Sequence, residues 1–342
     1  MFNKSYKYQV YPSVEQEKII NKTFKACNFV YNHYLKIQKD LFKRGKKKMS
    51  AYDCIKDLTE LKKKVTWLNE VSSQALQCTL KDLNAAYQKF LEECTDFPKF
   101  KSDDDYWQSY TTRGSIHYRG EYIQIPTLGL VKTKNKLSPE GRILTVTVSK
   151  EPSGKYYVSL HCTDIEMKAF AITEKSVGLA FGKESICVIS DGNVYKNPNA
   201  LKQSFDKLAK LQRDLQRKVK GSANYEKARV KVAKLQEKIR NQKLDYLHKL
   251  TTDLIRNYDV LYIQELEISN AKLKIIDVSY QNLINMLKYK AEYYGREIVF
   301  VTKDVQLDAN TSDVEYLKCK AKEILQAGSE QPSGQVELPQ AA

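Results

Sequence analysis

The sequence predicts a multidomain α+β protein in which a helical block interrupts a β-rich region and a separate α/β region follows. The chain has 342 residues, enough for two or three independent cores. Short runs of alternating apolar and polar residues, separated by Gly and Pro, predict strands between about residues 100 and 164. Apolar residues spaced three and four apart predict helices before and after that region.

The first predicted strand, residues 4–11, ends at Pro12 and has no other strand near it in the sequence. We therefore expect it to pair with the strands after residue 100, which makes the helical block an insertion. The basic segment Lys43–Lys48 is predicted to be a loop, and Phe97-Pro98 ends the block. Helices are expected over three segments of the block: 13–35, 52–63 and 72–90.

The third region opens with VGLAFGKESICVISDG, whose two apolar runs and Asp-Gly turn predict a β-hairpin. Two long helices follow, with a break at Gly221-Ser222. Between Leu201 and Leu250 they carry 15 Lys+Arg against 5 Asp+Glu, so this helical hairpin can pack by one face and hold a phosphate backbone with the other. The other elements expected here are strands over 177–181, 185–190, 194–195, 259–264 and 297–302, and helices over 280–294 and 314–326.

The charge of the chain indicates its kind of partner. There are 57 Lys+Arg against 41 Asp+Glu, a net charge of +16. An excess of this size most often meets nucleic acid, and the alternative is a basic protein with no such partner. The 23 tyrosines add rings that can stack on bases. The 7 cysteines are scattered without a CxxC pair, which argues against a zinc ribbon and a disulfide framework.

The two ends of the chain carry further expectations. The amino terminus lacks the apolar core of a signal peptide, and no segment approaches a membrane span, so we expect a cytoplasmic protein at the bacterial nucleoid. The polar end, residues 327–342, is predicted to be disordered.

The order of elements after residue 175 suits an RNase H-like α/β fold. Nucleases of this fold place carboxylates on the first strand, on the strand after the crossover and near the final helix. These carboxylates hold two divalent ions for phosphodiester cleavage.

On these residues the chain resembles the transposon-encoded TnpB family of RNA-guided nucleases, relatives of the type V CRISPR effectors. The matching segments are YKYQVYP, FVYNHYL, WLNEVSSQALQ, FPKFKS, IPTLGLVK, VGLAFGKESICVISDG, NQKLDYLHKL, LYIQELEIS and LKYKAEYYGREIVFV. The resemblance implies a β-barrel wedge domain, an inserted helical recognition domain and a RuvC nuclease domain with a basic helical hairpin. The implied boundaries are 1–12 and 98–170 for the wedge, 13–97 for the recognition domain, and 171–326 for the RuvC domain with its hairpin over about 201–256.

The chain departs from the family at the chemistry. The first metal-binding Asp of the family corresponds to Ala180, the Glu to Gln264, and the last Asp to Asn310. A shift of one residue would substitute Glu265 for Gln264, but it would break the match to Leu266 and turn the side chain to the other face. The family's zinc-binding insertion is missing too. We therefore expect neither a Mg²⁺ nor a Zn²⁺ site, and no nuclease activity.

The resemblance then implies a nuclease-dead relative of the kind called TldR, which represses transcription. Its partners would be a guide RNA and double-stranded DNA, with one protein copy in the ribonucleoprotein. Guide pairing and a short target-adjacent motif would specify a site near a promoter.

Two sets of binding residues follow from the resemblance. For the target-adjacent motif they are Ser72, Gln74, Gln77, Ser109, Thr111 and Thr112. For the guide RNA or its heteroduplex they are Tyr8, Tyr11, Asn32, Tyr34, Lys99, Lys101, Arg113, Arg213, Arg217, Lys243 and His248. Core packing for the tyrosines, and a surface or capping role for Ser72 and Gln74, are the structural alternatives.

Two other functions stay open at this point. A residual RNA-guided nuclease would need to rebuild a metal site from Glu265, Asp308 and Asp313. A guide-free, basic nucleic-acid-binding remnant of a transposon protein would bind with steep salt dependence and little sequence preference.

Overall fold

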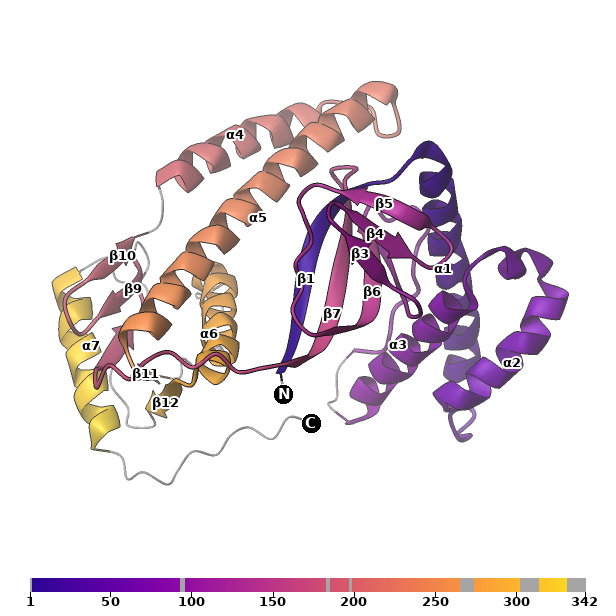
Figure 1. Ribbon diagram of the computed structural model, residues 1–342. Coiled ribbons are helices and arrows are strands. Elements are labelled where there is room, and N and C mark those ends of the chain that lie inside the picture. The colour runs from indigo at the N-terminus through magenta and orange to yellow at the C-terminus, as the bar shows by residue number, and fades with distance from the viewer. Residues whose placement is uncertain are drawn as a thin grey trace. The chain divides into compact units, whose positions relative to one another are not determined.

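Figure 1 presents the computed structural model, which describes residues 2–92, 96–182, 185–196, 199–264, 274–301 and 314–330. The chain forms two compact units, Met1–Glu166 and Met167–Ala342. Within the described ranges, every helix is too short or too polar to cross a membrane.

The N-terminal unit contains a seven-stranded antiparallel sheet (Figure 1). Its strands are β1 (Phe2–Tyr11), β2 (Gln108–Thr112), β3 (His117–Arg119), β4 (Tyr122–Ile125), β5 (Gly129–Thr133), β6 (Arg142–Lys150) and β7 (Tyr156–Ile165). They follow the order β2-β6-β7-β1-β5-β4-β3. The opening strand β1 pairs with β7 along most of its length and with β5 at its end, which confirms that it joins the later strands.

The two outermost strands, β2 and β3, were not predicted from the sequence. Each is short, and neither shows the apolar alternation that marks a half-buried strand: His117–Arg119 is exposed throughout. The sheet order begins at β2 and ends at β3, and no ladder joins the two among the described strands. The closed barrel therefore stays a prediction.

The helical block consists of α1 (Val14–Lys43), α2 (Ala51–Lys64), the 3₁₀ helix η1 (Thr66–Glu70) and α3 (Ser73–Glu92). Ser13 begins α1 with a capping box, since its side chain accepts from the Gln16 backbone N–H while the Gln16 side chain accepts from the Ser13 N–H. The Phe24 ring is fully buried and meets the Tyr110 ring edge-on at 5.6 Å, so α1 packs against β2. The predicted loop between α1 and α2 is confirmed.

The C-terminal unit is built on a five-stranded sheet of order β10-β9-β8-β11-β12. Its elements are β8 (Ser176–Ala180), β9 (Ser185–Ile189), β10 (Val194–Lys196), α4 (Asn199–Gln216), α5 (Ala223–Asn257), β11 (Val260–Gln264), α6 (Lys274–Tyr294), β12 (Glu297–Val301) and α7 (Val314–Ser329). The first three strands form an antiparallel meander, while β8, β11 and β12 run parallel. This is the element order that predicted an RNase H-like fold.

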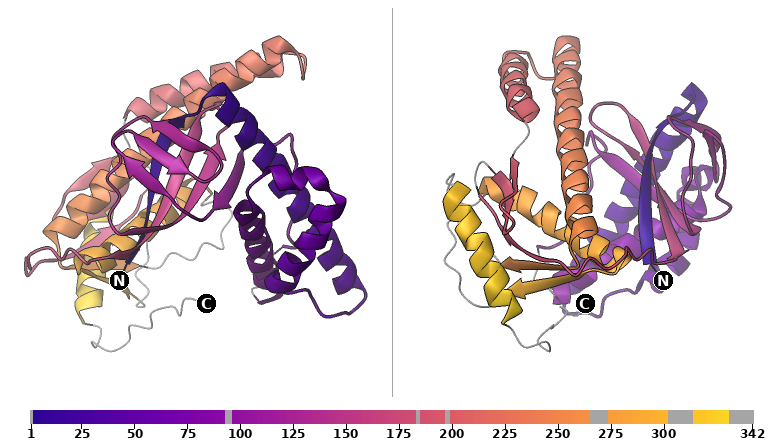
Figure 2. Two further views of the ribbon diagram at one scale, coloured as in Figure 1. Left: turned by 45° about the vertical axis from the view of Figure 1, so that its right-hand side comes forward. Right: turned by 60° about the vertical axis from the view of Figure 1, so that its left-hand side comes forward.

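The two faces of this sheet pack on different helices (Figure 2). Leu179 belongs to a core with residues of α5 and α6, such as Leu250 and Leu287. Ala180, the next residue along β8, belongs instead to a smaller core with Leu317 and other residues of α7. The alternation of a strand thus assigns each helix layer to one face.

Several helix boundaries differ from the sequence predictions. Helix α1 continues to Lys43, beyond the predicted end at residue 35. The first hairpin helix ends at Gln216, before the Gly221 break, and α6 begins at Lys274. The last helix continues through Ser329, into the segment predicted to be disordered, because Ala327 is buried in the α7 core. Residues 331–342 of that segment lie outside the described ranges.

A buried ion pair ties the start of this unit to its sheet. The Arg296 guanidinium lies 2.6 Å from the Asp259 carboxylate and also donates to the carbonyls of Ile255 and Ala171. Asp259 in turn accepts from the backbone N–H groups of Thr173 and Glu174. Every charged group here has a hydrogen-bond partner, which is what makes the burial of a guanidinium tolerable.

Lys290 of α6 is a buried cation with neutral partners. Its side chain is 6% exposed, and its ammonium donates to the His248 carbonyl and to the hydroxyls of Thr251 and Thr252 at 2.7–2.8 Å. Burial lowers the pKa of this lysine to about 8. In the folded state it therefore loses its proton before it does in the unfolded chain.

This difference gives a pH dependence of stability. Between about pH 8 and 10 the unfolded chain binds more protons at Lys290, so stability rises with pH. Relative to Lys290→Met, the wild type is expected to gain about 2 kcal/mol of unfolding free energy between pH 7.5 and 9.5. Urea unfolding at both pH values measures it, with Lys249→Met on the exposed face of α5 as the control. If the unfolding free energies of the wild type and of Lys290→Met changed by the same amount between the two pH values, the prediction would be refuted.

Candidate functional site

The resemblance assigns the first two metal-binding carboxylates to positions at the C-terminal ends of two neighbouring strands of the C-terminal sheet. Ala180 is the last residue of β8, and Gln264 is the last residue of β11. Leu179 pairs with Ile263 in the parallel ladder, and Gln264 pairs with Val301 at the end of β12. The fold therefore brings the first two of these positions to the same edge, as the resemblance implies.

The surroundings of Ala180 are apolar. Its side chain has no exposed surface and packs with Val188, Val301 and Leu317. Helix α7 lies so close to β8 that a Cβ added at Gly178 would meet the Ala321 carbonyl oxygen at 2.0 Å. A residue two positions further along the same face is therefore held under the helix, in a setting that suits a methyl group and penalises a carboxylate.

The remaining candidates of this site lie outside the described residues. These are Asn310 and the three carboxylates of the alternative arrangement, Glu265, Asp308 and Asp313. Within the described ranges, no three His, Cys, Asp or Glu side chains are grouped to hold a metal ion. The apolar contacts of Ala180 do not fit a Mg²⁺ ligand set, which consists of oxygen atoms.

The helical hairpin carries a cationic groove between α4 and α5, which run side by side in Figure 1. Leu211 and Leu235 contribute its apolar part. The other lining residues are all lysines: Lys207, Lys210, Lys231, Lys234 and Lys238. The lysines line the groove mainly through their aliphatic stems, and all five are exposed. A helix pair this rich in exposed cations is suited to the regularly spaced charges of a phosphate backbone.

The predicted backbone contacts on this hairpin lie outside the lining of the groove. Arg213 and Arg217 are exposed, and Arg213 donates to the Ala209 carbonyl. Lys243 is half-buried, and burial lowers its pKa. His248 lies beside Tyr289, and part of its surface is exposed. Partial desolvation of its ring, and then the charge of Lys290, lower the pKa of His248, which favours the neutral imidazole.

Sequence reasoning missed the five groove lysines, although a signal for them exists. Lys231, Lys234 and Lys238 are spaced three and four residues apart. Lys210 and Leu211 likewise follow Lys207 by three and four residues. This spacing places each set on one helix face, next to the apolar stripe.

The N-terminal sheet has a polar face, and the alternation of its strands separates the predicted contacts. Ser109 is exposed, and Thr111 hydrogen-bonds the Thr147 hydroxyl at 2.9 Å on the neighbouring strand. Thr112 has no exposed surface, so its assignment to direct DNA contact is corrected: its side chain points to the core. All three residues lie within β2.

Two tyrosines of β1 were predicted to contact RNA, and they differ in exposure. Tyr11 is 49% exposed at the end of the strand. Tyr8 is half-buried, and burial raises its pKa. Only Tyr11 therefore offers a large ring surface to a base.

Two predicted RNA contacts in the helical block are structural. Tyr34 is fully buried and donates to the Asp57 carboxylate at 2.9 Å, so its assignment as an RNA contact is wrong. The Asn32 amide binds the backbone of Lys101 in both directions, at 2.8 Å each. Lys101 itself lies over the Tyr31 ring, and Lys99 is exposed. Arg113, in the N-terminal sheet unit, is exposed as well.

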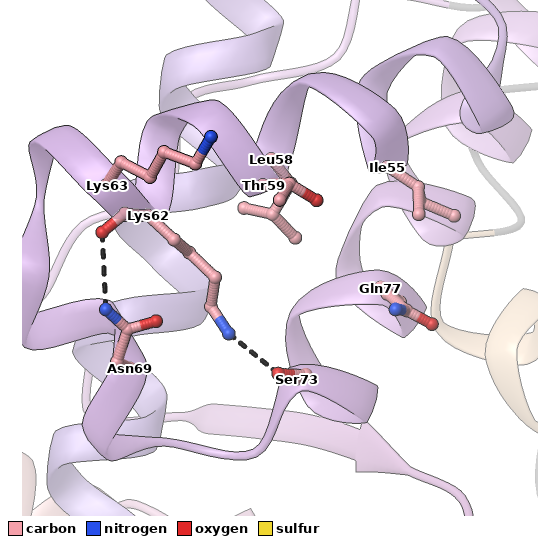
Figure 3. Close-up of a pocket in the computed structure, with 8 residues that line it drawn as sticks. All are labelled: Ile55, Leu58, Thr59, Lys62, Lys63, Asn69, Ser73 and Gln77. Carbon is pink, nitrogen blue, oxygen red and sulfur yellow. Dashed lines mark hydrogen bonds between the residues drawn. The ribbon is translucent and has the colours of Figure 1, made fainter.

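One predicted motif-reading residue of α3, Gln77, borders a pocket (Figure 3). Gln77 lines it together with Ser73, which accepts from the Lys62 ammonium at 2.7 Å. Gln74 is exposed, whereas Ser72 is 8% exposed at the start of the helix. Ser72 is buried directly before α3, and its carbonyl accepts from the Ala75 N–H. Of Ser72, Gln74 and Gln77, only the two glutamines therefore keep surface for a base edge.

Comparison with known proteins identifies the family. A family model described as "Probable transposase", of the OrfB/IS605 type, matches residues 155–274. A protein from Streptomyces pristinaespiralis described as "Putative RNA-guided DNA endonuclease" is 35% identical over 317 residues, which span 88% of this chain and 77% of the relative. The chain belongs to the TnpB family of IS605-type transposon proteins.

Other similarities of this TnpB-family chain agree with that assignment. A protein from Escherichia coli strain K12, described as "Putative RNA-guided DNA endonuclease InsQ", is 33% identical over 270 residues, or 78% of this chain and 67% of the relative. The solved structure of a Cas12f1–sgRNA–target DNA complex contains a similar fold, with a TM-score of 0.56 and 11% identity over 97% of this chain and 99% of that chain.

A second family model, described as "Helix-turn-helix domain", matches residues 1–47. In the structure this stretch contains one strand, β1, and one helix, α1, whose 30 residues run without a break. The first helix of the match is thus a single long element that packs on the sheet.

The groove supports a comparison between two pairs of cations. Lys234→Gln with Lys238→Gln is expected to weaken nucleic-acid binding and to reduce the slope of log affinity against log salt by about 1.5, the value for two lost phosphate contacts. Arg213→Gln with Arg217→Gln removes the same charge outside the groove and serves as the matched control. Fluorescence anisotropy at several salt concentrations measures both. A larger effect of the arginine pair would move the binding surface away from the groove.

Proposed function

We propose that this chain is a nuclease-dead, RNA-guided DNA-binding protein that represses transcription from a promoter-proximal target. The observation that carries the proposal is the buried methyl of Ala180 at the first carboxylate position, packed against α7. The chain also carries the lysine-lined groove of the hairpin and a net positive charge. A methyl at the position where the resemblance implies a metal-binding carboxylate, in a chain with basic surfaces, favours occupancy of DNA over cleavage.

In the proposed mechanism, recognition is divided between RNA and protein. Guide pairing with one DNA strand reads most of the sequence, and polar side chains such as Gln74 and Gln77 read a short motif beside the target. The groove lysines hold a phosphate backbone. Without metal-assisted cleavage the complex stays on the DNA and obstructs RNA polymerase.

The first experiment is to purify the tagged protein from its native cells and sequence the RNA bound to it. We expect one dominant species with a fixed scaffold and a short variable end that matches a chromosomal promoter. Bulk ribosomal and transfer RNA would instead support a guide-free basic binder. Guide-dependent nicking of target DNA by the reconstituted complex, with Mg²⁺ or Mn²⁺, would support a residual nuclease.

Restoring carboxylates tests whether the site has been repacked. Ala180→Asp with Gln264→Glu is expected to produce no guide-dependent cleavage, because the new Asp side chain enters an apolar core. We expect this pair to lower the unfolding free energy by about 3 kcal/mol at pH 7.

The matched control is Ala209→Asp, which adds the same side chain to the exposed face of α4. It should leave stability nearly unchanged. Cleavage by the restored protein in Mg²⁺ or Mn²⁺, together with wild-type stability, would show that the loss of these two carboxylates had silenced an otherwise intact site.

A further inference from the structure

Three phenylalanine rings meet where α1 and α3 end, and a fourth shares a lysine with one of them. Phe42 of α1 contacts Phe90 of α3 at 5.6 Å between centroids, and Phe97 lies 5.1 Å from Phe90. Phe100 adds a fourth ring, joined to the others through Lys39, whose ammonium lies 5.9 Å from the Phe97 centroid and 5.8 Å from that of Phe100. We call this group, Phe42, Phe90, Phe97 and Phe100, the aromatic tip.

The aromatic tip presents unusual apolar surface. Phe42 is 50% exposed and Phe100 is 51% exposed, while Phe90 and Phe97 are half-buried. A single exposed phenylalanine is ordinary, but several contacting rings make a patch of the kind that marks an interaction site.

A basic loop is fixed against the same helix end. Helix α1 closes with a Schellman motif: the Gly45 N–H donates to the Phe42 carbonyl, and the Lys46 N–H donates to the Leu41 carbonyl. Gly45 adopts a left-handed φ of +62°, which this motif needs. The chain from Lys43 to Lys48 reads KRGKKK, so five cations follow directly on Phe42.

Rings and cations together define the chemistry of a partner. Aromatic rings stack on any base through its π face, while ammonium and guanidinium groups neutralise the phosphates between bases. Lys39 already shows the ring–cation geometry with two of the rings. A duplex keeps its base faces stacked inside, so a single strand is the form that can use both features.

We propose that the aromatic tip and the Lys43–Lys48 loop form a stacking site for unpaired nucleotides of single-stranded nucleic acid. The site extends the proposed function and rests on nucleic-acid binding alone, since it requires neither repression nor a lost nuclease activity.

The test compares two decamer probes on the full chain: oligoadenylate RNA, and an abasic RNA of the same length and charge. Fluorescence anisotropy should show that the wild type binds oligoadenylate about tenfold more tightly than the abasic probe. In Phe42→Ala with Phe100→Ala this preference should fall to about twofold or less, with the salt dependence unchanged. A DNA oligoadenylate and a duplex of equal length complete the series, and the duplex should show no loss in the variant.

Tyr52→Ala is the matched control, because Tyr52 is a 75% exposed ring of the same helical block outside the aromatic tip. It should keep the full preference for bases. The opposite signature is expected from Lys47→Gln with Lys48→Gln, which should lower the salt slope and leave the base preference in place. An unchanged preference in the phenylalanine variant, or an equal loss in Tyr52→Ala, would overturn the proposal.

A second readout does not depend on folding of a variant. Photo-crosslinking of the wild type to a 5-bromouridine decamer should yield adducts on peptides that contain Phe42 or Phe100, and adducts only elsewhere would refute the site. Retention of guide RNA in cells is scored separately. A wild type without guide RNA but with the base preference would reject the guided mechanism and keep this surface.

Discussion

The close approach of α7 to β8 governs what the C-terminal unit can do. At Gly178 the helix backbone occupies the space that a Cβ would need, with the Ala321 carbonyl oxygen as the nearest atom. Because side chains alternate along a strand, Ala180 then faces the same helix and lies among its apolar residues. The packing of α7 on β8 therefore both completes the smaller core and keeps the surroundings of position 180 apolar.

The charged side chains of the C-terminal unit show the opposite preference, for the surface over the interior. Two buried ions of the C-terminal unit have defined partners: Arg296 pairs with Asp259, and Lys290 binds a carbonyl and two hydroxyls. The lysines that line the groove between α4 and α5 are exposed. A protein organised in this way gains rigidity from a small number of buried polar contacts and keeps its excess positive charge available for a polyanion.

Sequence reasoning succeeded where periodicity and burial agree. Strands β6 and β7 alternate between a core face and a half-exposed face, and Ser13 marks the start of α1 by its capping chemistry. It failed where a side chain has two possible roles. Tyr34 could have been a stacking ring, but the structure buries it against Asp57. Thr111 and Thr112 lie on opposite faces of β2. Which of the two faces the core depends on the register of β2 against β6, and composition does not encode this register.

The central position of β1 has a consequence for how this protein comes into being on the ribosome. Strand β1 leaves the ribosome before both of its neighbours, β5 and β7, so its two ladders stay open until residues 129–133 and 156–165 have followed. The helices α1–α3 are made of local contacts and can form in the meantime, while β1 waits with both edges unpaired. Synthesis of the first half of the chain therefore has a vulnerable interval, which ends when β7 emerges and closes the sheet around its own beginning.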